Sequence, residues 1–161
     1  MEIKDQDGPV GPRVGPLKEA AATVLRCYEG PLAVMSFNPH PIAAMAELAP
    51  DLPRGFTTAA IRPEDWRGLT PETCVRLRDM PDYDQVDACF ISHKFTDLSW
   101  PRVLEIKAQG AALLCWAITS AAAEREARSL PTTSPSRAIS PDRTPRARPR
   151  PDMTGAEPSR A

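Results

Sequence analysis

The chain lacks the closely spaced ligands that a zinc site needs. Its four cysteines, Cys27, Cys74, Cys89 and Cys115, are far apart, they form no CxxC motif, and no histidine lies at ligand spacing. Each cysteine sits in an apolar helix or strand pattern, which is typical of a buried free thiol. We therefore exclude a zinc site and expect buried, free cysteines.

The chain also lacks a hydrophobic run long enough to cross a membrane, and no apolar signal-peptide segment follows its charged start. The formal net charge is only -1, so the overall charge gives no reason to expect attraction to nucleic acid or to a membrane surface. These absences favour a cytoplasmic protein with no nucleic-acid partner and no membrane span.

The last part of the chain, residues 129–161, lacks aromatic side chains and is rich in proline, serine, threonine and arginine. Residues 130–161 carry a net charge of +3, which leaves -4 for the rest. Such a segment buries too little apolar surface to offset its ordering entropy, so we predict a disordered tail after a domain at 1–128. Two interpretations stay open. In one, the tail binds an anionic partner. In the other, the tail is translated from an out-of-frame extension of the gene, because suitable codons for 129–140 would encode a strand-like sequence in another frame.

Buried strands and amphipathic helices alternate through the first 128 residues. The hydrophobic content of 42% in 161 residues is enough for a sizeable core. Thr70 followed by Pro71 is a typical helix start. The apolar patterns predict strands at 1–5, 32–37, 53–58, 86–92 and 111–118, and helices at 17–28, 41–48, 71–80, 101–107 and 121–128.

This alternation predicts an α/β fold with a parallel sheet and helices outside it. Five such strands with short connections fit a consecutive portion of a TIM (β/α)8 barrel, whose full length is about 250 residues. An open doubly wound sheet is the alternative, but no glycine-rich phosphate loop follows any strand. We therefore favour an incomplete barrel.

Two charged side chains mark the first predicted strand. Glu2 and Lys4 are two residues apart, so on a strand they point to the same face. In a barrel that face is the mouth, where an enzyme holds a metal ion and a phosphate. At a chain end, the same spacing also fits two solvated charges.

With these segments in place, residues 1–128 resemble the C-terminal half of the glycerophosphodiester phosphodiesterase family. The members are metal-dependent hydrolases with a TIM barrel of the PLC-like phosphodiesterase type. The resemblance rests on the order and spacing of four motifs: Glu2-Ile3-Lys4, Ser36-Phe37-Asn38-Pro39, Phe90-Ile91-Ser92-His93 and Leu114-Cys115-Trp116-Ala117-Ile118.

The resemblance implies a role for four residues. Glu2 is similar to the third carboxylate ligand of a Ca²⁺ or Mg²⁺ ion, and Lys4 to the lysine that faces the substrate phosphate. Trp116 would line the pocket for the glycerol moiety, with Phe37 as its apolar floor, although both also fit ordinary packing. The complete enzyme would hydrolyse a small glycerophosphodiester to an alcohol and glycerol 3-phosphate.

The family's first half supplies a His-Arg step, a Glu-x-Asp metal pair and a His-Asp step, and this sequence contains none of them. Neither His40 nor His93 occupies a catalytic position of the family. We therefore expect a truncated, inactive copy with no catalytic residue and with weak or absent cation binding. Two alternatives stay open: a non-catalytic module that completes a barrel with an N-terminal half-barrel chain, and an unrelated α/β binding domain.

Overall fold

The computed structural model describes residues 1–6 and 8–129, so the predicted tail beyond Ser129 lies outside the described residues. None of the helices in the described part has the length and hydropathy needed to span a membrane. The elements are α1 (Leu17–Leu25), β1 (Val34–Ser36), α2 (Pro39–Leu48), β2 (Arg54–Thr58), α3 (Pro71–Asp79), α4 (Asp82–Gln85), β3 (Phe90–Lys94), η1 (Phe95–Asp97), α5 (Pro101–Ala108), β4 (Ala112–Trp116) and α6 (Ala121–Ser129).

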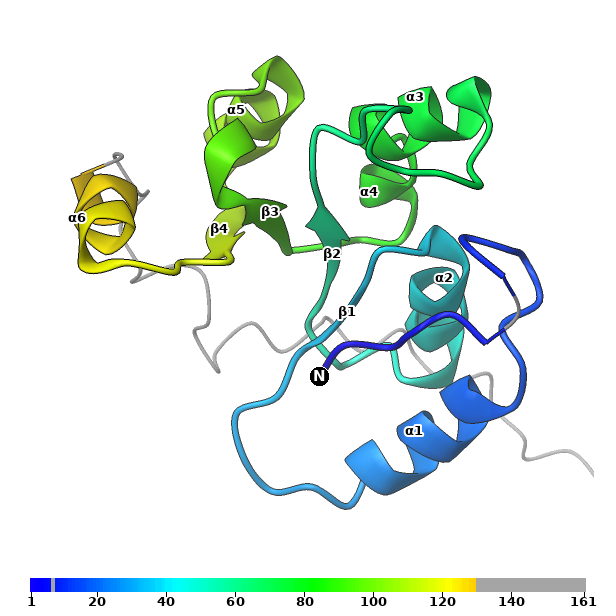
Figure 1. Cartoon of the computed structure of the whole chain (residues 1–161). Helices are drawn as coiled ribbons and strands as arrows, with labels where there is room; N and C mark the ends of the chain where they lie inside the picture. The colour runs from blue at the N-terminus through cyan, green and yellow to red at the C-terminus, as the bar shows by residue number, and fades with distance from the viewer. Residues whose placement is uncertain (7, 130–161) are drawn as a thin grey trace, which may run out of the picture.

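The four strands form one parallel sheet in the order β1-β2-β3-β4 (Figure 1). Glu2 adds a parallel bridge to Met35 at the outer edge of β1. Consecutive strands as neighbours are what a barrel portion requires, whereas a doubly wound sheet reverses its strand order at a switch point. The α/β fold is confirmed. Within the described residues the sheet is open, and its assignment to an incomplete TIM barrel stays a prediction.

One face of the sheet carries the core. The paired residues Phe56, Ile91 and Leu113 point to the same side, because partners in a parallel register share a face. We call this side the helix-covered face, since its apolar side chains pack on those of α2, α4 and α5. The buried members of this core are Ile42, Phe56, Met80, Tyr83, Val86, Ile91, Val103, Ile106 and Ala111.

The other side of the sheet is called the opposite face. Its side chains alternate with those of the core along each strand. Most of them are shielded by neighbouring segments, but Leu114 in β4 stays 48% exposed. The opposite face comprises Met35, Gly55, Thr57, Phe90, Ser92, Lys94, Ala112, Leu114 and Trp116.

Two helices begin with a side-chain cap, one of them at the predicted residue and the other at a position two residues earlier. The Thr70 hydroxyl accepts a hydrogen bond from the Thr73 amide at 3.2 Å, and proline occupies the first turn of α3. Asn38 caps α2 in the same way, through the His40 amide at 2.9 Å, so α2 begins at Pro39 rather than at residue 41. Both caps satisfy backbone donors that the helix itself leaves unpaired.

Several predicted boundaries are wrong. Residues 86–88 are not strand, because the short helix α4 ends there and β3 begins only at Phe90. Residues 1–5 form a single bridge rather than a strand. The first helix ends at Leu25, which leaves Cys27 exposed, and Cys89 and Cys115 are only half-buried. Cys74 is buried as predicted, and all four thiols are free.

Candidate functional site

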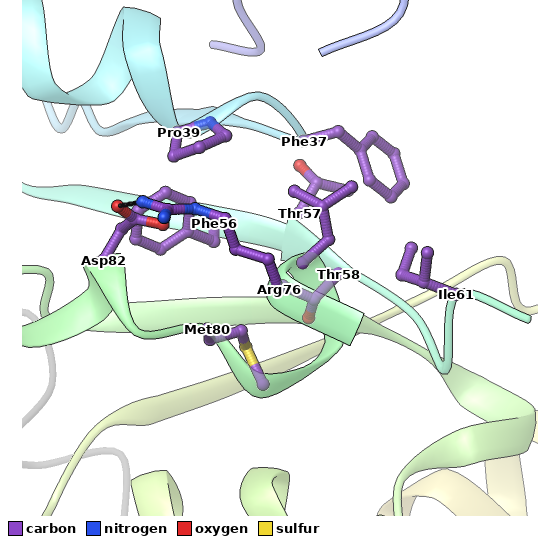
Figure 2. Close-up of a pocket in the computed structure, with 10 residues that line it drawn as sticks. Phe37, Pro39, Phe56, Thr57, Thr58, Ile61, Arg76, Met80 and Asp82 are labelled. Carbon is purple, nitrogen blue, oxygen red and sulfur yellow. Dashed lines mark hydrogen bonds and ion pairs between the residues drawn. The ribbon is translucent and has the colours of Figure 1, made fainter. Parts of the chain in front are cut away.

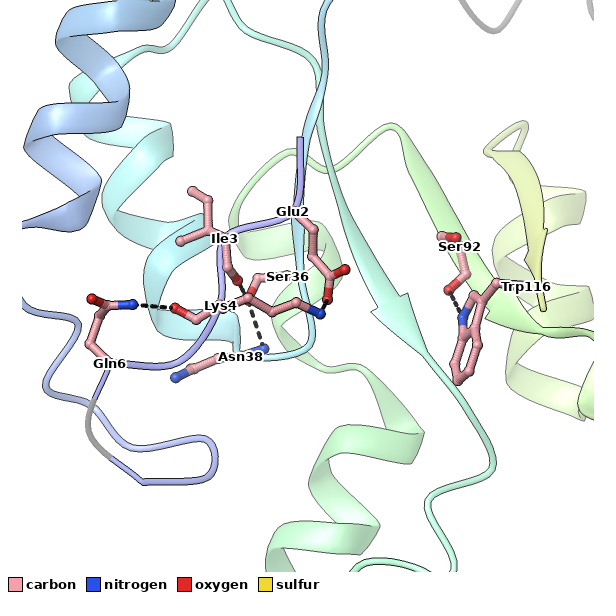
Figure 3. Close-up of polar contacts among 8 residues, drawn as sticks. All are labelled: Glu2, Ile3, Lys4, Gln6, Ser36, Asn38, Ser92 and Trp116. Carbon is pink, nitrogen blue, oxygen red and sulfur yellow. Dashed lines mark hydrogen bonds and ion pairs between the residues drawn. The ribbon is translucent and has the colours of Figure 1, made fainter.

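The candidate site begins at the N-terminal segment, where Glu2 and Lys4 contact each other. The Lys4 ammonium lies 2.6 Å from the Glu2 carboxylate, as Figure 3 shows. Ile3 between them points the other way and is buried with Val34 and Met45. The Lys4 side chain is 71% exposed, whereas that of Glu2 is 25% exposed. The two predicted charges therefore share one face as an ion pair with a solvated cation.

Polar side chains at the end of β1 hold this segment in place. The Ser36 hydroxyl donates a hydrogen bond to the Ile3 carbonyl at 2.6 Å. The buried Asn38 amide group donates to the Asp5 carboxylate at 2.7 Å and to the Gly11 carbonyl at 2.8 Å. These buried bonds fix the backbone on both sides of Lys4, so they determine where the ion pair lies.

Phe37 and Trp116 also meet, although β1 and β4 lie at opposite ends of the sheet order. Their ring centroids are 5.6 Å apart in an edge-to-face arrangement. The Trp116 indole donates a hydrogen bond to the Ser92 carbonyl at 2.9 Å, which fixes the plane of its ring (Figure 3). The structure thus forms two pairs, Glu2 with Lys4 in the N-terminal segment and Phe37 with Trp116, where Phe37 directly follows β1 and Trp116 is the last residue of β4.

A third aromatic residue, Trp66, packs against Phe37. It is not identified as a site residue from the sequence. Its ring centroid lies 5.2 Å from that of Phe37. The loop that carries it is held by Asp97, whose carboxylate accepts hydrogen bonds from the Ala60 amide at 3.3 Å and from Arg62 at 3.1 Å. An aromatic residue in the loop after a parallel strand is the signal that could have found it, because such loops line ligand sites.

The cavity beside these aromatic residues is small. Its volume is about 20 Å³, which is room for about one water molecule. Arg76 and Asp82 form an ion pair of 2.6 Å next to it, as Figure 2 shows. A glycerophosphodiester does not fit inside, so this cavity is no substrate pocket. It is lined by Phe37, Pro39, Phe56, Thr57, Thr58, Ile61, Arg76, Leu77, Met80 and Asp82.

The described residues by themselves do not complete a Ca²⁺ or Mg²⁺ site. These hard cations take six or more oxygen ligands, and among residues 1–6 and 8–129 no group of three or more ligating side chains converges. Near Glu2, the carboxylate of Asp5 is already used, since it accepts hydrogen bonds from Asn38 and from the Val10 amide at 2.9 Å. Glu2 itself is paired with Lys4, so we derive no reaction step through a metal.

His93 is buried away from these groups. It lies on the helix-covered face, with its Nδ1 2.7 Å from the Thr58 hydroxyl. Burial lowers the pKa of His93 to about 4, although the nearby Asp97 carboxylate acts in the opposite direction. The imidazole is therefore neutral at pH 7. His40, the other histidine, is exposed in the first turn of α2.

Comparison with known proteins gives one finding at the level of structure. No family model matches the chain, and no curated protein matches it. Among solved structures, the chain is similar to a phosphodiesterase from Oleispira antarctica, determined in complex with the product sn-glycerol-3-phosphate. The identity is 20%, the match covers 68% of this chain and 40% of that one, and the TM-score is 0.48. The chain therefore matches less than half the length of that phosphodiesterase.

Proposed function

We propose that this chain is a glycerophosphodiester phosphodiesterase-like protein that keeps one side of the family's substrate site and does not hydrolyse the substrate. The observation that carries the proposal is the placement of the four residues that the resemblance selects. Glu2 contacts Lys4 in the segment that bridges β1, and Phe37, which follows β1, contacts Trp116 at the end of β4 in the same parallel sheet. Ligands of parallel α/β sheets bind at the carboxyl ends of the strands.

Lys4 would bind the phosphate of a small glycerophosphodiester. Its ammonium is largely exposed and its close partner is the Glu2 carboxylate, so the monoanionic phosphodiester can compete for it. Phe37 and Trp116 would offer apolar surface to the glycerol carbons. In the complete enzyme a divalent cation polarises the phosphate, and in this chain Glu2 would be one ligand of that ion.

Hydrolysis requires groups that carry protons to and from the reacting oxygens. His93 is buried on the other face of the sheet, and His40 lies in the first turn of α2, where its amide is bonded to Asn38. Neither histidine contacts the Glu2–Lys4 pair among the described interactions. The lack of such a group beside this pair among the described residues supports the proposed inactivity. A cytoplasmic location remains a prediction.

The test separates binding from turnover. Calorimetric titration with sn-glycerol 3-phosphate should show weak binding that Lys4→Gln reduces at least tenfold, because the variant loses the cation that would face the phosphate. Lys18→Gln is the matched control, since Lys18 pairs with Glu19 at 2.9 Å outside the site. Incubation of the unmodified protein with glycerophosphocholine and Ca²⁺ or Mg²⁺ should release no glycerol 3-phosphate. Metal-dependent release would contradict the inactivity, and equal binding by both lysine variants would contradict the site.

A second candidate function is a non-catalytic module that completes a barrel with a different chain. It is favoured by the outer edge of β4, which has no strand partner among the described residues. Co-expression with a chain that carries the His-Arg, Glu-x-Asp and His-Asp motifs should then give one stable complex, and activity should appear only in that complex. Separate elution of the two chains would contradict this candidate.

A further inference from the structure

The two edges of the sheet differ in their protection against pairing. At the β1 edge, the Ile3 amide donates to the Met35 carbonyl at 2.8 Å and the Met35 amide donates to the Met1 carbonyl at 2.9 Å. This added segment is very short and carries the charges of Glu2 and Lys4, two features that discourage further pairing. The β1 edge is therefore closed.

The β4 edge has no such protection. Its five residues, Ala112–Trp116, include no charge, no proline and no glycine. The Ala112 amide donates to the Cys89 carbonyl of the neighbouring chain segment at 3.1 Å. Because amides alternate in direction along a strand, those of Leu113 and Cys115 point to the outer edge. Leu114 between them is 48% exposed, and Ile118 just beyond the strand is 37% exposed.

A hollow beside β4 has room for another strand. It lies between β4 and α6 and has a volume of about 530 Å³. Figure 1 shows α6 set apart from the sheet beyond β4, and no residue of α6 is buried. After a helix in this position, a right-handed βαβ connection normally places the next strand beside β4. The hollow is lined by Leu113, Leu114, Cys115, Ile118, Glu124, Ala127 and Arg128.

The sequence that follows α6 is unsuited to a central strand. It begins Leu130-Pro131-Thr132-Thr133-Ser134-Pro135, and proline cannot donate to a ladder of strand hydrogen bonds. The segment directly after α6 is therefore a poor candidate for the strand that would fill this hollow.

We propose that the occupant is β4 of a second copy of this chain, paired antiparallel about a two-fold axis. A strand without charge is complementary to itself, and pairing that centres on Leu114 would bury the exposed leucines of both copies against each other. The rim of the hollow carries both signs of charge, Glu124 and Arg128, which lie 2.8 Å apart. A two-fold axis brings the same patch from both copies together, so these charges can pair across the interface.

One open edge per copy sets the size of the assembly. Pairing through the same edge on both copies consumes that edge, so the assembly closes as a dimer and does not grow into a filament. The proposal concerns a surface separate from Lys4 and its phosphate, and it holds whether or not the chain binds a glycerophosphodiester.

The test compares particle mass among matched variants of the full chain. Light scattering after gel filtration should give twice the mass of one chain for the unmodified protein. Leu114→Lys should give a folded monomer, because it places a charge at the centre of the pairing. Leu104→Lys is the control, since Leu104 is 49% exposed on α5, away from this edge, and it should stay dimeric. Circular dichroism checks that each variant is folded.

A backbone variant keeps the test decisive if Leu114→Lys unfolds. Cys115→Pro removes one outward amide without removing a hydrogen bond to β3, and it should also give a monomer. In the unmodified protein, hydrogen exchange at the Leu113 and Cys115 amides should slow as protein concentration rises. A monomeric unmodified protein, a larger open assembly, or a dimer that survives both β4 variants would overturn the proposal.

Discussion

Gly55 lies where β2 and β3 approach so closely that a side chain has no room. A Cβ atom at this position would lie 2.7 Å from ring atoms of Phe90 and in still closer contact with the Phe90 carbonyl. Phe90 is the register partner of Gly55 and points to the same face. The glycine is therefore required by the packing of two neighbouring strands.

We predict that Gly55→Ala lowers the free energy of unfolding by about 1–3 kcal/mol, as overpacking of a core typically does. Urea denaturation followed by circular dichroism measures the change. Phe90→Leu in the same background should recover part of the loss, because it removes the ring that the new methyl group meets. A double-mutant cycle without favourable coupling between the two positions would contradict this account.

His93 gives the stability a pH dependence. Its pKa is lowered to about 4 in the folded protein by burial, from an ordinary value of 6.5. Between these two values the unfolded chain binds more protons than the folded chain, so the free energy of unfolding rises with pH across this window. The contribution of the buried, neutral His93 to the free energy of unfolding is complete above pH 6.5, and it is lost as the pH falls to about 4.

We predict that this loss is on the order of 2–3 kcal/mol, measured by urea denaturation at several pH values between 4 and 7. His93→Gln keeps a polar group beside the Thr58 hydroxyl but does not titrate. The variant should be less stable at pH 7 and should show a flatter pH dependence in this window. An unchanged slope in the variant would assign the effect to other groups.

At the scale of elements, the two helix caps differ in how much they hold together. Thr70 is exposed, and its hydroxyl is hydrogen-bonded to the amide and to the hydroxyl of a single residue, Thr73, at the start of α3. Asn38 is 2% exposed, caps α2, and also ties down Asp5 and Gly11. Removal of Asn38 therefore breaks partly buried hydrogen bonds to three residues, whereas removal of Thr70 breaks exposed hydrogen bonds to one residue.

We predict a loss of about 1 kcal/mol for Thr70→Ala and at least twice that for Asn38→Ala, both measured by chemical denaturation. Asn38→Ala should also increase the proteolysis rate in residues 8–16, because their anchor at Gly11 is lost. Thr70→Ala should leave that rate unchanged. Equal losses for the two variants would show that the bonds of Asn38 to the N-terminal segment contribute little.

Helix starts could be predicted from the sequence because capping depends on local residue types. The short helix α4 could not. Val86 and Ala88 alternate with polar residues, and this spacing fits a strand as well as the end of a helix. In the structure Asp87 has a φ of 52°, a left-handed conformation that follows α4 and that the residue type does not reveal. The error at 86–88 follows from that ambiguity.

At the scale of the whole molecule, the sequence predicted the parallel α/β architecture and a common face for Glu2 and Lys4, but it predicted neither their ion pair nor the ring contact between Phe37 and Trp116. The alternation of buried strands and helices is enough to imply sequential strand neighbours. It could not place Trp66, because its contact with Phe37 depends on a loop that Asp97 anchors across 35 residues or more of sequence. Long-range loop anchoring of this kind leaves no local pattern.

The last prediction concerns divalent cations and the whole fold. A cation that binds only the folded chain raises its melting temperature, in proportion to the logarithm of its concentration over the dissociation constant. No group of three or more ligating side chains converges among the described residues, and the Glu2 carboxylate is already paired with Lys4 at 2.6 Å. We therefore predict that Ca²⁺ or Mg²⁺ leaves the melting temperature equal to that in EDTA, with ionic strength matched by NaCl. Glu2→Gln should behave identically. A cation-dependent rise that Glu2→Gln abolishes would mean that Glu2 does ligate the ion and that further ligands come from outside the described residues.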